Sequence, residues 1–466
     1  MASLSSDALR SLRACAIAAA ALSGSAAPLG AQTLSDTLVR VYQNNPALNA
    51  QRAQLRVTDE NVPQALSGYR PQLSAALTAG VQPVKDWFFD GTTQTATLRP
   101  RMAGVTLTQP LFNGFKTANS VRQAEAQVRS GREALRNVEQ SVFVTAVTAY
   151  MNIVADQGLV EAQRANVIFL RELLAATRRR LDAGDVTPTD VAQADARFNR
   201  GLSDLNAAEV ALAIDQAIYA QVVGSRPGRL APAEPIDRLL PASREDAVAF
   251  GRREHPTVVA ASYDVNTAEA AIKVAEAALY PTVSAQGSVS HSEETDTTLS
   301  AQRTDQASVI GSATVPLYDG GLAASQVRQA KETLAQTRLV LDQVRLQNDT
   351  AVATAWAQNE GAKAAVRAAE AEVRAATVAL EGVRREALAG QRTTIDVLNA
   401  QQDLMGAKSR LIAAQRDRVV ASYAMLAAIG RFDHNRLALA TPDYEPQTHY
   451  YQVHDAWHGL RTPAGQ

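Results

Sequence analysis

The chain has 466 residues, of which 46% are hydrophobic, 20% charged and only 5% aromatic. Its 46 basic and 47 acidic residues give a formal net charge of −1, which argues against a nucleic-acid-binding protein, because such proteins carry a basic surface. Alanine, the strongest helix former, contributes 89 residues. We therefore expect long, closely packed helices rather than a core built from large aromatic side chains.

Residues 1–31 have the pattern of a secretory signal peptide. Arg10 and Arg13 precede a short apolar run, and Ala31 is a small residue before a cleavage point. The alternative is a buried N-terminal helix. Because the one cysteine, Cys15, lies in this segment, the mature chain would lack disulfides, thiolate catalysis and thiolate metal sites. No apolar run of ~18 residues follows, so we expect no transmembrane helix.

The rest of the chain repeats itself. The segment PLFNG at 110–114 returns as PLYDG at 316–320, and an Ala-Gly pair at 183–184 returns at 389–390. Self-similarity of this kind indicates a duplicated structural unit. We predict a first repeat, a proline-rich linker, a second repeat and a C-terminal tail at 32–224, 225–243, 244–430 and 431–466, respectively.

Each repeat is predicted to contain a helix, two strands and two long helices. Apolar residues alternate with polar or small ones, which predicts strands at 72–82 and 99–109 in the first repeat and at 282–291 and 306–315 in the second. Strands of ~9–11 residues are long enough to cross a bilayer when tilted. Trp87, Phe88 and Phe89 lie in the first intervening loop, where they are expected at the membrane surface or in an external loop. A disordered loop is the alternative.

The longest predicted elements are helices. About 65 residues without proline follow the turn at 319–321, and the same length recurs from Thr117 to Asp182, which corresponds to ~100 Å of helix. Gly184 and Gly390 are expected to end these helices. Return helices follow, and the second shows a heptad seam typical of a coiled coil, although an amphipathic core helix would show it too. The predicted return helices span 189–223 and 395–429.

Four membrane-length strands cannot close a barrel. Open sheet edges are not tolerated in lipid, because their unpaired backbone groups meet no water, and the smallest single-chain outer-membrane barrels have 8 strands. Several chains must therefore share one barrel, and three chains would supply twelve strands, with the helices forming a second tube below. A secreted, cysteine-free chain of this kind belongs in the outer membrane of a Gram-negative cell.

The two repeated motifs, together with GQRTTIDVLNAQQ at 390–402, make the chain resemble the TolC family of outer-membrane efflux and secretion channels. The resemblance implies a mainly α-helical homotrimer with a twelve-stranded β-barrel in outer-membrane lipid and a long α-barrel in the periplasm. It implies docking on a periplasmic adaptor (a membrane fusion protein) and on an inner-membrane ABC or RND transporter. The expected function is passive conduction from that pump to the outside, with no cofactor and no nucleic acid.

The resemblance assigns roles at the periplasmic entrance. Asp396 matches an aspartate that faces the pore, and Asn399 stands where some relatives have a second acid. Asp190 is the corresponding residue of the first repeat. Arg392 matches an arginine that ties the closed tip together, whereas Ala387 replaces a tyrosine, so we hypothesise a less tightly sealed entrance. The alternatives are helix capping for the two aspartates and a solvated position for the arginine.

Further positions are assigned by the same resemblance. The helix-turn-helix tips at Gly184 and Gly390 would dock the adaptor. At the strand-to-helix junctions, packing is favoured over ligand binding for the two aromatic residues. Arg178, Arg179 and Arg180 fit a solvated run near a helix end. The predicted junction residues are Pro110, Phe112, Gly114, Pro316, Tyr318 and Gly320.

No catalytic motif is present in the sequence, so we expect no enzyme activity. Tail histidines are interpreted as incidental residues of a flexible segment rather than metal ligands. A soluble periplasmic coiled-coil adaptor or scaffold is the alternative function; it explains the long helices but not the strands. A periplasmic enzyme is the third, and it has no site residues. The tail histidines are His449, His454 and His458.

Overall fold

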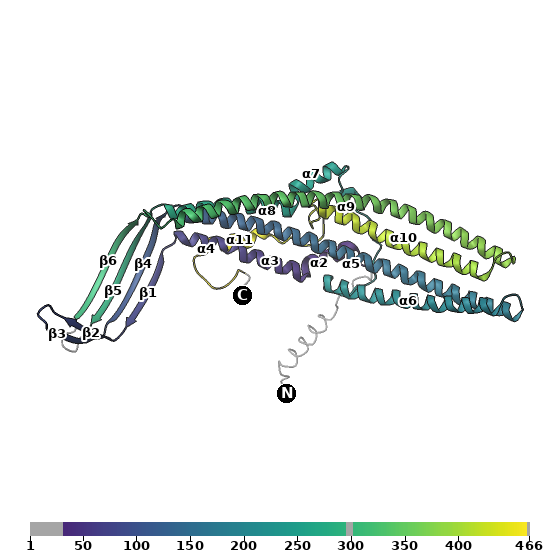
Figure 1. Cartoon of the computed structure of the whole chain (residues 1–466), viewed down its shortest axis with the longest axis horizontal. Coiled ribbons are helices and arrows are strands. Elements are labelled where there is room, and N and C mark those ends of the chain that lie inside the picture. The colour runs from purple at the N-terminus through teal and green to yellow at the C-terminus, as the bar shows by residue number, and fades with distance from the viewer. Residues whose placement is uncertain (1–30, 295–301, 464–466) are drawn as a thin grey trace, which may run out of the picture.

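The computed structural model describes residues 31–294 and 302–463, so the predicted signal peptide lies almost entirely outside the described residues. The molecule is elongated, with a curved sheet at one end and two helical hairpin tips at the other (Figure 1). The helices are α2 (Leu34–Asn44), α3 (Pro46–Asp59), α4 (Asn61–Leu66), α5 (Lys116–Asp182), α6 (Pro188–Val223), α7 (Arg244–Glu254), α8 (Pro256–Glu276), α9 (Leu322–Leu388), α10 (Thr394–Ala428) and α11 (Pro446–Val453). Short 3-10 turns are η1 (Ser67–Tyr69), η2 (Asp237–Leu239) and η3 (Ala277–Leu279).

The strands form two antiparallel sheets. The larger sheet has the order β1-β4-β5-β6, and β2 pairs only with β3. Because β4 and β5 come from different repeats, their pairing joins the two repeats side by side. The strands are β1 (Gln72–Ala79), β2 (Gln82–Trp87), β3 (Thr93–Leu98), β4 (Arg101–Asn113), β5 (Thr282–Glu294) and β6 (Gln302–Thr314).

The segment between the first two predicted strands differs from expectation. It was predicted as a loop, but β2 and β3 form a ribbon that continues the hairpin beyond the larger sheet. The Asp90-Gly91 pair makes the turn, with Gly91 at φ +84°, a conformation that favours glycine. Phe89 at its tip is fully exposed. Weak alternation, carried mainly by threonines, hid these strands from the periodicity analysis.

The long helices match the expected length. Helices α5 and α9 each contain 67 residues, which corresponds to ~100 Å at the rise of an α-helix. Each turns at its tip and returns as α6 or α10 along the preceding helix. Contrary to expectation, α5 is apolar enough in one 18-residue window to pass for a membrane span, but half of that window is buried inside the protein. We therefore assign that stretch to the core.

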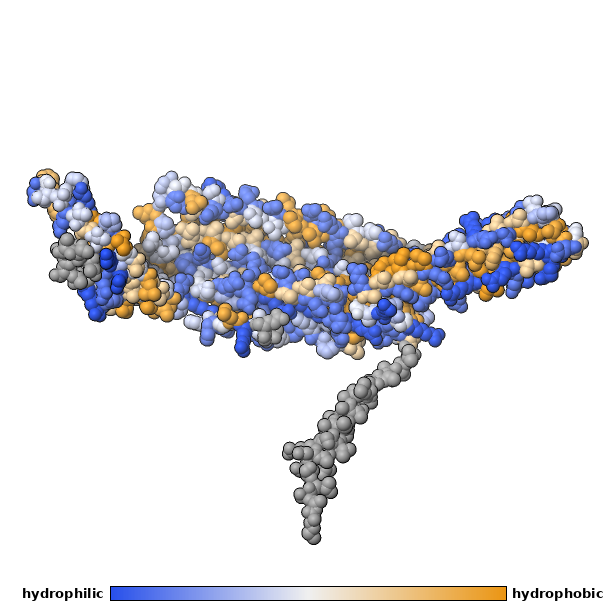
Figure 2. All heavy atoms as spheres, turned by 90° about the horizontal axis from the view of Figure 1, so that it is seen from below, coloured by the Kyte–Doolittle hydropathy of each residue, from blue (hydrophilic) through white to orange (hydrophobic). Residues whose placement is uncertain are grey.

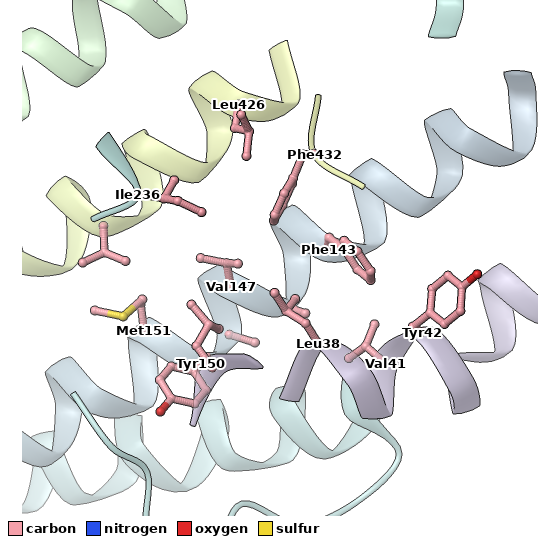
Figure 3. Packing of buried hydrophobic residues seen from close by; sticks show 14 of the residues in the cluster. Leu38, Val41, Tyr42, Phe143, Val147, Tyr150, Met151, Ile236, Leu426 and Phe432 are labelled. Atoms are coloured by element: carbon pink, nitrogen blue, oxygen red, sulfur yellow. The ribbon is translucent and has the colours of Figure 1, made fainter. Parts of the chain in front are cut away.

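The main hydrophobic core lies midway along the molecule, where several elements converge on α5 (Figure 3). Phe143 and Tyr150 of α5 are completely buried, as is Phe432, which follows α10. The rings of Phe143 and Phe432 pack edge to face with centroids 5.5 Å apart. Fully burying one such side chain contributes about 1.5–3 kcal/mol, so this cluster holds the N-terminal helices and the tail against both hairpins.

The tail is not flexible, as had been predicted, but packs along the protein. His434 contacts the buried Glu139 of α5, with Nδ1 2.8 Å from Oε1. The Tyr444 amide donates to the Tyr42 hydroxyl, and the Arg52 guanidinium lies over the rings of both tyrosines. The two hydrogen-bonded contacts join residues 295 and 402 positions apart, distances at which sequence periodicity carries no information.

Candidate functional site

The two hairpin tips are built identically. Gly184 and Gly390 adopt positive φ angles of +83° and +75° and let the chain turn, as predicted. The return helices then begin in capping boxes. In the second tip, the Asp396 carboxylate accepts from the backbone N–H of Thr393 at 2.9 Å and from its hydroxyl at 2.7 Å. Asp190 makes the same pair of bonds with Thr187.

These hydrogen bonds set the charge at the tips. The backbone N–H of Thr393, followed by its hydroxyl, holds the pKa of Asp396 below its ordinary value. The backbone and hydroxyl of Thr187 do the same to the pKa of Asp190. Both carboxylates are therefore negative at neutral pH, and both residues are partly exposed at the hairpin tips. The capping role that was the alternative interpretation is therefore present at both tips.

The predicted gate arginine contacts its own hairpin. Arg392 Nε lies 3.0 Å from Glu386 Oε2, so within the described residues this pair does not join the two hairpins. Ala387 lines a cleft of 390 Å³ between the two tips, together with Phe169 and Arg180 of the first hairpin. A tyrosine in place of Ala387 would occupy part of this cleft.

A cross-hairpin contact that the sequence did not reveal lies one turn further along α10. Arg197 of α6 donates to Asn399 Oδ1 at 3.2 Å and also bonds Gln402. Deeper in the same seam, Gln401 Nε2 donates to Asn166 Oδ1 at 2.8 Å. The only hint of this contact in the sequence was the pair of glutamines, Gln401 and Gln402, soon after Asn399. The residues that they bond, Asn166 and Arg197, belong to the other repeat. Among the described residues, Asn399 thus serves as a bridge between hairpins.

The larger sheet has one apolar and one polar face. Paired residues on one face include Val105 opposite Val289 and Leu73 opposite Leu107, and all four are exposed. On the other face serine hydroxyls pair across β5 and β6, for example Ser288 with Ser308 at 2.9 Å. Side chains alternate between the two faces of a strand, so this arrangement suits lipid on one side and water on the other.

The junctions between strands and helices differ between the repeats. Pro110 lies within β4, at a bulge before Phe112, and not at the strand's end. The Phe112 ring packs edge to face on Phe115, with centroids 5.2 Å apart. In the second repeat Tyr318 is 88% exposed, so the predicted packing of this residue is wrong for the single chain. There the Asp319 carboxylate instead caps α9 by accepting from backbone amides.

Gly114 and Gly320 both have positive φ angles, +64° and +73°, and Pro316 lies in the irregular turn before α9.

Arg178 of the basic run pairs with Asp195 at 3.2 Å, and its side chain remains largely exposed. Among the described residues, no group of three or more histidine, cysteine, aspartate or glutamate side chains is arranged to hold a metal ion.

A carboxyl pair between α5 and α6 was not predicted. Burial, followed by the charge of Asp215, raises the pKa of Asp156 to about 6, and Arg416 opposes this shift weakly. One oxygen of Asp156, Oδ2, is buried and has no hydrogen-bond partner within the described part of the chain. Asp156 is therefore protonated more readily than an ordinary aspartate, and its ionisation is opposed by burial and by the negative charge of Asp215.

We expect the substitution Asp156→Asn to stabilise the protein at pH 7.5 but hardly at pH 3.5, below both pKa values. A folded-state pKa above the unfolded value means that folding takes up protons, so stability falls as pH rises from about 4 through about 6. Discounted for solvent screening, the gain is about 1 kcal/mol. Thermal unfolding at both pH values measures it, with Asp215→Asn as the matched variant. An equal gain at both pH values would contradict a titrating pair.

The sequence matches the family model described as "Outer membrane efflux protein" over residues 37–225 and 252–431. It is 41% identical over 439 residues to the outer membrane efflux protein BepC of Brucella suis, covering 93% of each chain. It is 25% identical over 427 residues to the outer membrane protein TolC of Vibrio cholerae, covering 88% of this chain and 93% of that protein.

Solved structures support the same fold. The Campylobacter jejuni CmeC outer membrane channel superimposes with a TM-score of 0.76 at 13% identity, covering 91% of this chain and 89% of that one. The matches are to passive outer-membrane channels that work with efflux or secretion machinery, so the alternatives of a soluble periplasmic adaptor and of an enzyme are wrong. The chain belongs to the outer membrane efflux protein family, and it is an exit duct of efflux or type I secretion, with a β-barrel in the outer membrane and an α-helical tunnel in the periplasm.

Proposed function

We propose that three copies assemble into one channel, in which twelve strands close the barrel. The single observation that carries this proposal is the state of the sheet edges. Within the described residues, the outer edges of β1 and β6 have no partner strand, and both strands carry apolar side chains suited to lipid. When β6 of one copy pairs with β1 of the next, the backbone N–H and C=O groups at the sheet edges gain hydrogen-bond partners. No edge of the barrel then remains open to lipid.

Exposed apolar side chains on the long helices support the same assembly. Val210, Ile214 and Ile218 recur every four residues on one face of α6, and each is more than 40% exposed. Leu339 and Leu346 of α9 are 70% and 66% exposed. Figure 2 shows apolar residues grouped along the helical half that ends in the tips. Exposed apolar surface of this extent is typical of contacts between chains.

In the proposed trimer the polar face of the sheet lines the pore and the tips surround its periplasmic entrance. The duct conducts passively, and the energy comes from an inner-membrane ABC or RND pump. A periplasmic adaptor docks on the tips at Gly184 and Gly390. The predicted signal peptide at 1–31 directs the chain to the periplasm. The two repeats at 32–224 and 244–430, with the linker 225–243 between them, each supply one hairpin of strands and one of helices.

Two measurements test the assembly. The detergent-extracted protein is expected to have three times the mass of the mature chain by native mass spectrometry, and to form conducting pores in planar bilayers. A monomer or dimer would overturn the trimer. Recovery from the soluble periplasmic fraction would overturn the membrane placement as well.

We further propose that Asp396 forms a ring of three negative charges at the entrance, with Asn399 one turn deeper and Asp190 in a supporting position. Three carboxylates around one constriction favour cations. Their low pKa, held down by Thr393, keeps the ring charged at neutral pH. Arg392 is proposed to stabilise the closed tip through Glu386.

We expect Asp396→Asn to lower the cation preference of the pore, because asparagine still accepts a hydrogen bond from Thr393 but removes the charge. Reversal potentials across a salt gradient in planar bilayers measure the change. Asp190→Asn is the matched control, since its capping box is identical, and a smaller shift is expected there. An unchanged reversal potential in the Asp396 variant would remove this residue from the pore.

A further inference from the structure

The C-terminal tail runs from the main core to the foot of the barrel. It follows the chain's N-terminal helices as α11 and then continues beside Arg70, which lies two residues before β1. Arg70 donates to the carbonyl oxygen of Ala456, and its guanidinium lies 5.0 Å from the centroid of the Trp457 ring. Trp457 is thus held beside the segment that leads into β1.

Helix α11 fixes this position. His449 Nδ1 lies 3.0 Å from Oδ2 of Asp59, and that aspartate is completely buried. Tyr450 packs against a small cluster containing Val62 and Val128, and Val453 is 4% exposed. An attachment made of a buried polar contact and apolar packing holds the following residues in one place.

The residues beyond α11 present their apolar groups outward. Trp457 is 67% exposed and Leu460 is fully exposed, although both lie in a described and packed segment. Tyr69 and Tyr280, three and two residues before the starts of β1 and β5, are also about half exposed. Trp457, beside Arg70, and the two tyrosines thus lie near the starts of β1 and β5, and we refer to these three residues with Leu460 as the belt.

We propose that this belt is an anchor on the periplasmic leaflet of the outer membrane, and that Trp457 and Leu460 contact its phospholipids. Tryptophan and tyrosine prefer the boundary between head groups and acyl chains, because their rings are apolar and their edges polar. Arg70 and Arg461 lie beside this boundary, where phosphate groups are the available anions. This anchor rests on the proposed barrel. It gives the tail a role, with phospholipid as its partner.

Fluorescence of the assembled full-length protein in vesicles tests the anchor. The chain contains three tryptophans, so the difference in emission between wild type and Trp457→Phe isolates one indole. In vesicles of phospholipid brominated near the head-group end of the acyl chain, most of the Trp457 emission is expected to be lost. Aqueous iodide is expected to quench it weakly.

The double variant Tyr451→Trp with Trp457→Phe is the matched control. Tyr451 is 70% exposed on the same segment but lies on α11, further from the strands, so a tryptophan there should respond to iodide and not to brominated lipid. Quenching of Trp457 by iodide alone, or by neither agent, overturns the anchor. Pore conductance in the same vesicles distinguishes that outcome from failure of the barrel itself.

Discussion

Arginine in place of Val289 is expected to prevent stable insertion of the barrel. Val289 lies near the middle of β5 on the apolar face, opposite Val105 on one side and Ala307 on the other. A charged side chain facing lipid at the bilayer midplane costs about 2–4 kcal/mol, and each trimer would carry three. Urea titration of the protein in vesicles measures the loss, together with the yield of trimer in the outer-membrane fraction.

The matched variant is Gln286→Arg, three residues away on the same strand. Its side chain lies on the face that carries the paired serine hydroxyls, opposite Thr108 of β4 and Ile310 of β6, and water fills the proposed pore there. We expect less than about 1 kcal/mol of change there, because charges near the lumen keep their hydration. Equal losses from both variants would mean that the two faces of the sheet do not meet lipid and water as assigned.

Local signals explain why so much of the fold could be predicted. Val105 and Val289 can each be assigned to the apolar face of its strand from a period of two within that strand. This assignment requires no knowledge of the other strand. Thr393 with Asp396 is likewise a capping pattern contained in four residues. Features of this kind depend on near neighbours, so the sequence specifies them directly.

What could not be predicted depends on contacts between distant segments. The Arg197–Asn399 bridge joins α6 to α10, and His449 joins the tail to Asp59 in α3. Neither Arg197 nor His449 belongs to a motif. Which distant residues meet depends on how the folded segments pack against one another. The sequence alone therefore does not show that Arg197 and His449 have partners.

Two glycines that are equivalent in the repeat also have different surroundings. Gly114 and Gly320 end the matching motifs PLFNG and PLYDG, and both have positive φ angles. A Cβ atom at Gly114 would lie 2.6 Å from the carbonyl oxygen of Ala277 and 2.8 Å from Cβ of Tyr280. At Gly320, apart from the glycine itself and its two chain neighbours, no atom of the described residues lies within 4 Å of that position. The first junction is therefore packed against η3, and the second is open.

We expect Gly114→Ala to destabilise the protein by about 2–5 kcal/mol, because a left-handed alanine costs about 1–2 kcal/mol and overpacking adds about 1–3 kcal/mol. Gly320→Ala should be destabilised only by the left-handed backbone conformation, which costs about 1–2 kcal/mol. Chemical unfolding of both variants in the same detergent compares them. Backbone strain is common to the two sites, so any difference in the free energy of unfolding reports the contact with Ala277 and Tyr280. Equal losses would mean that η3 moves aside without cost and that the first junction is not rigid.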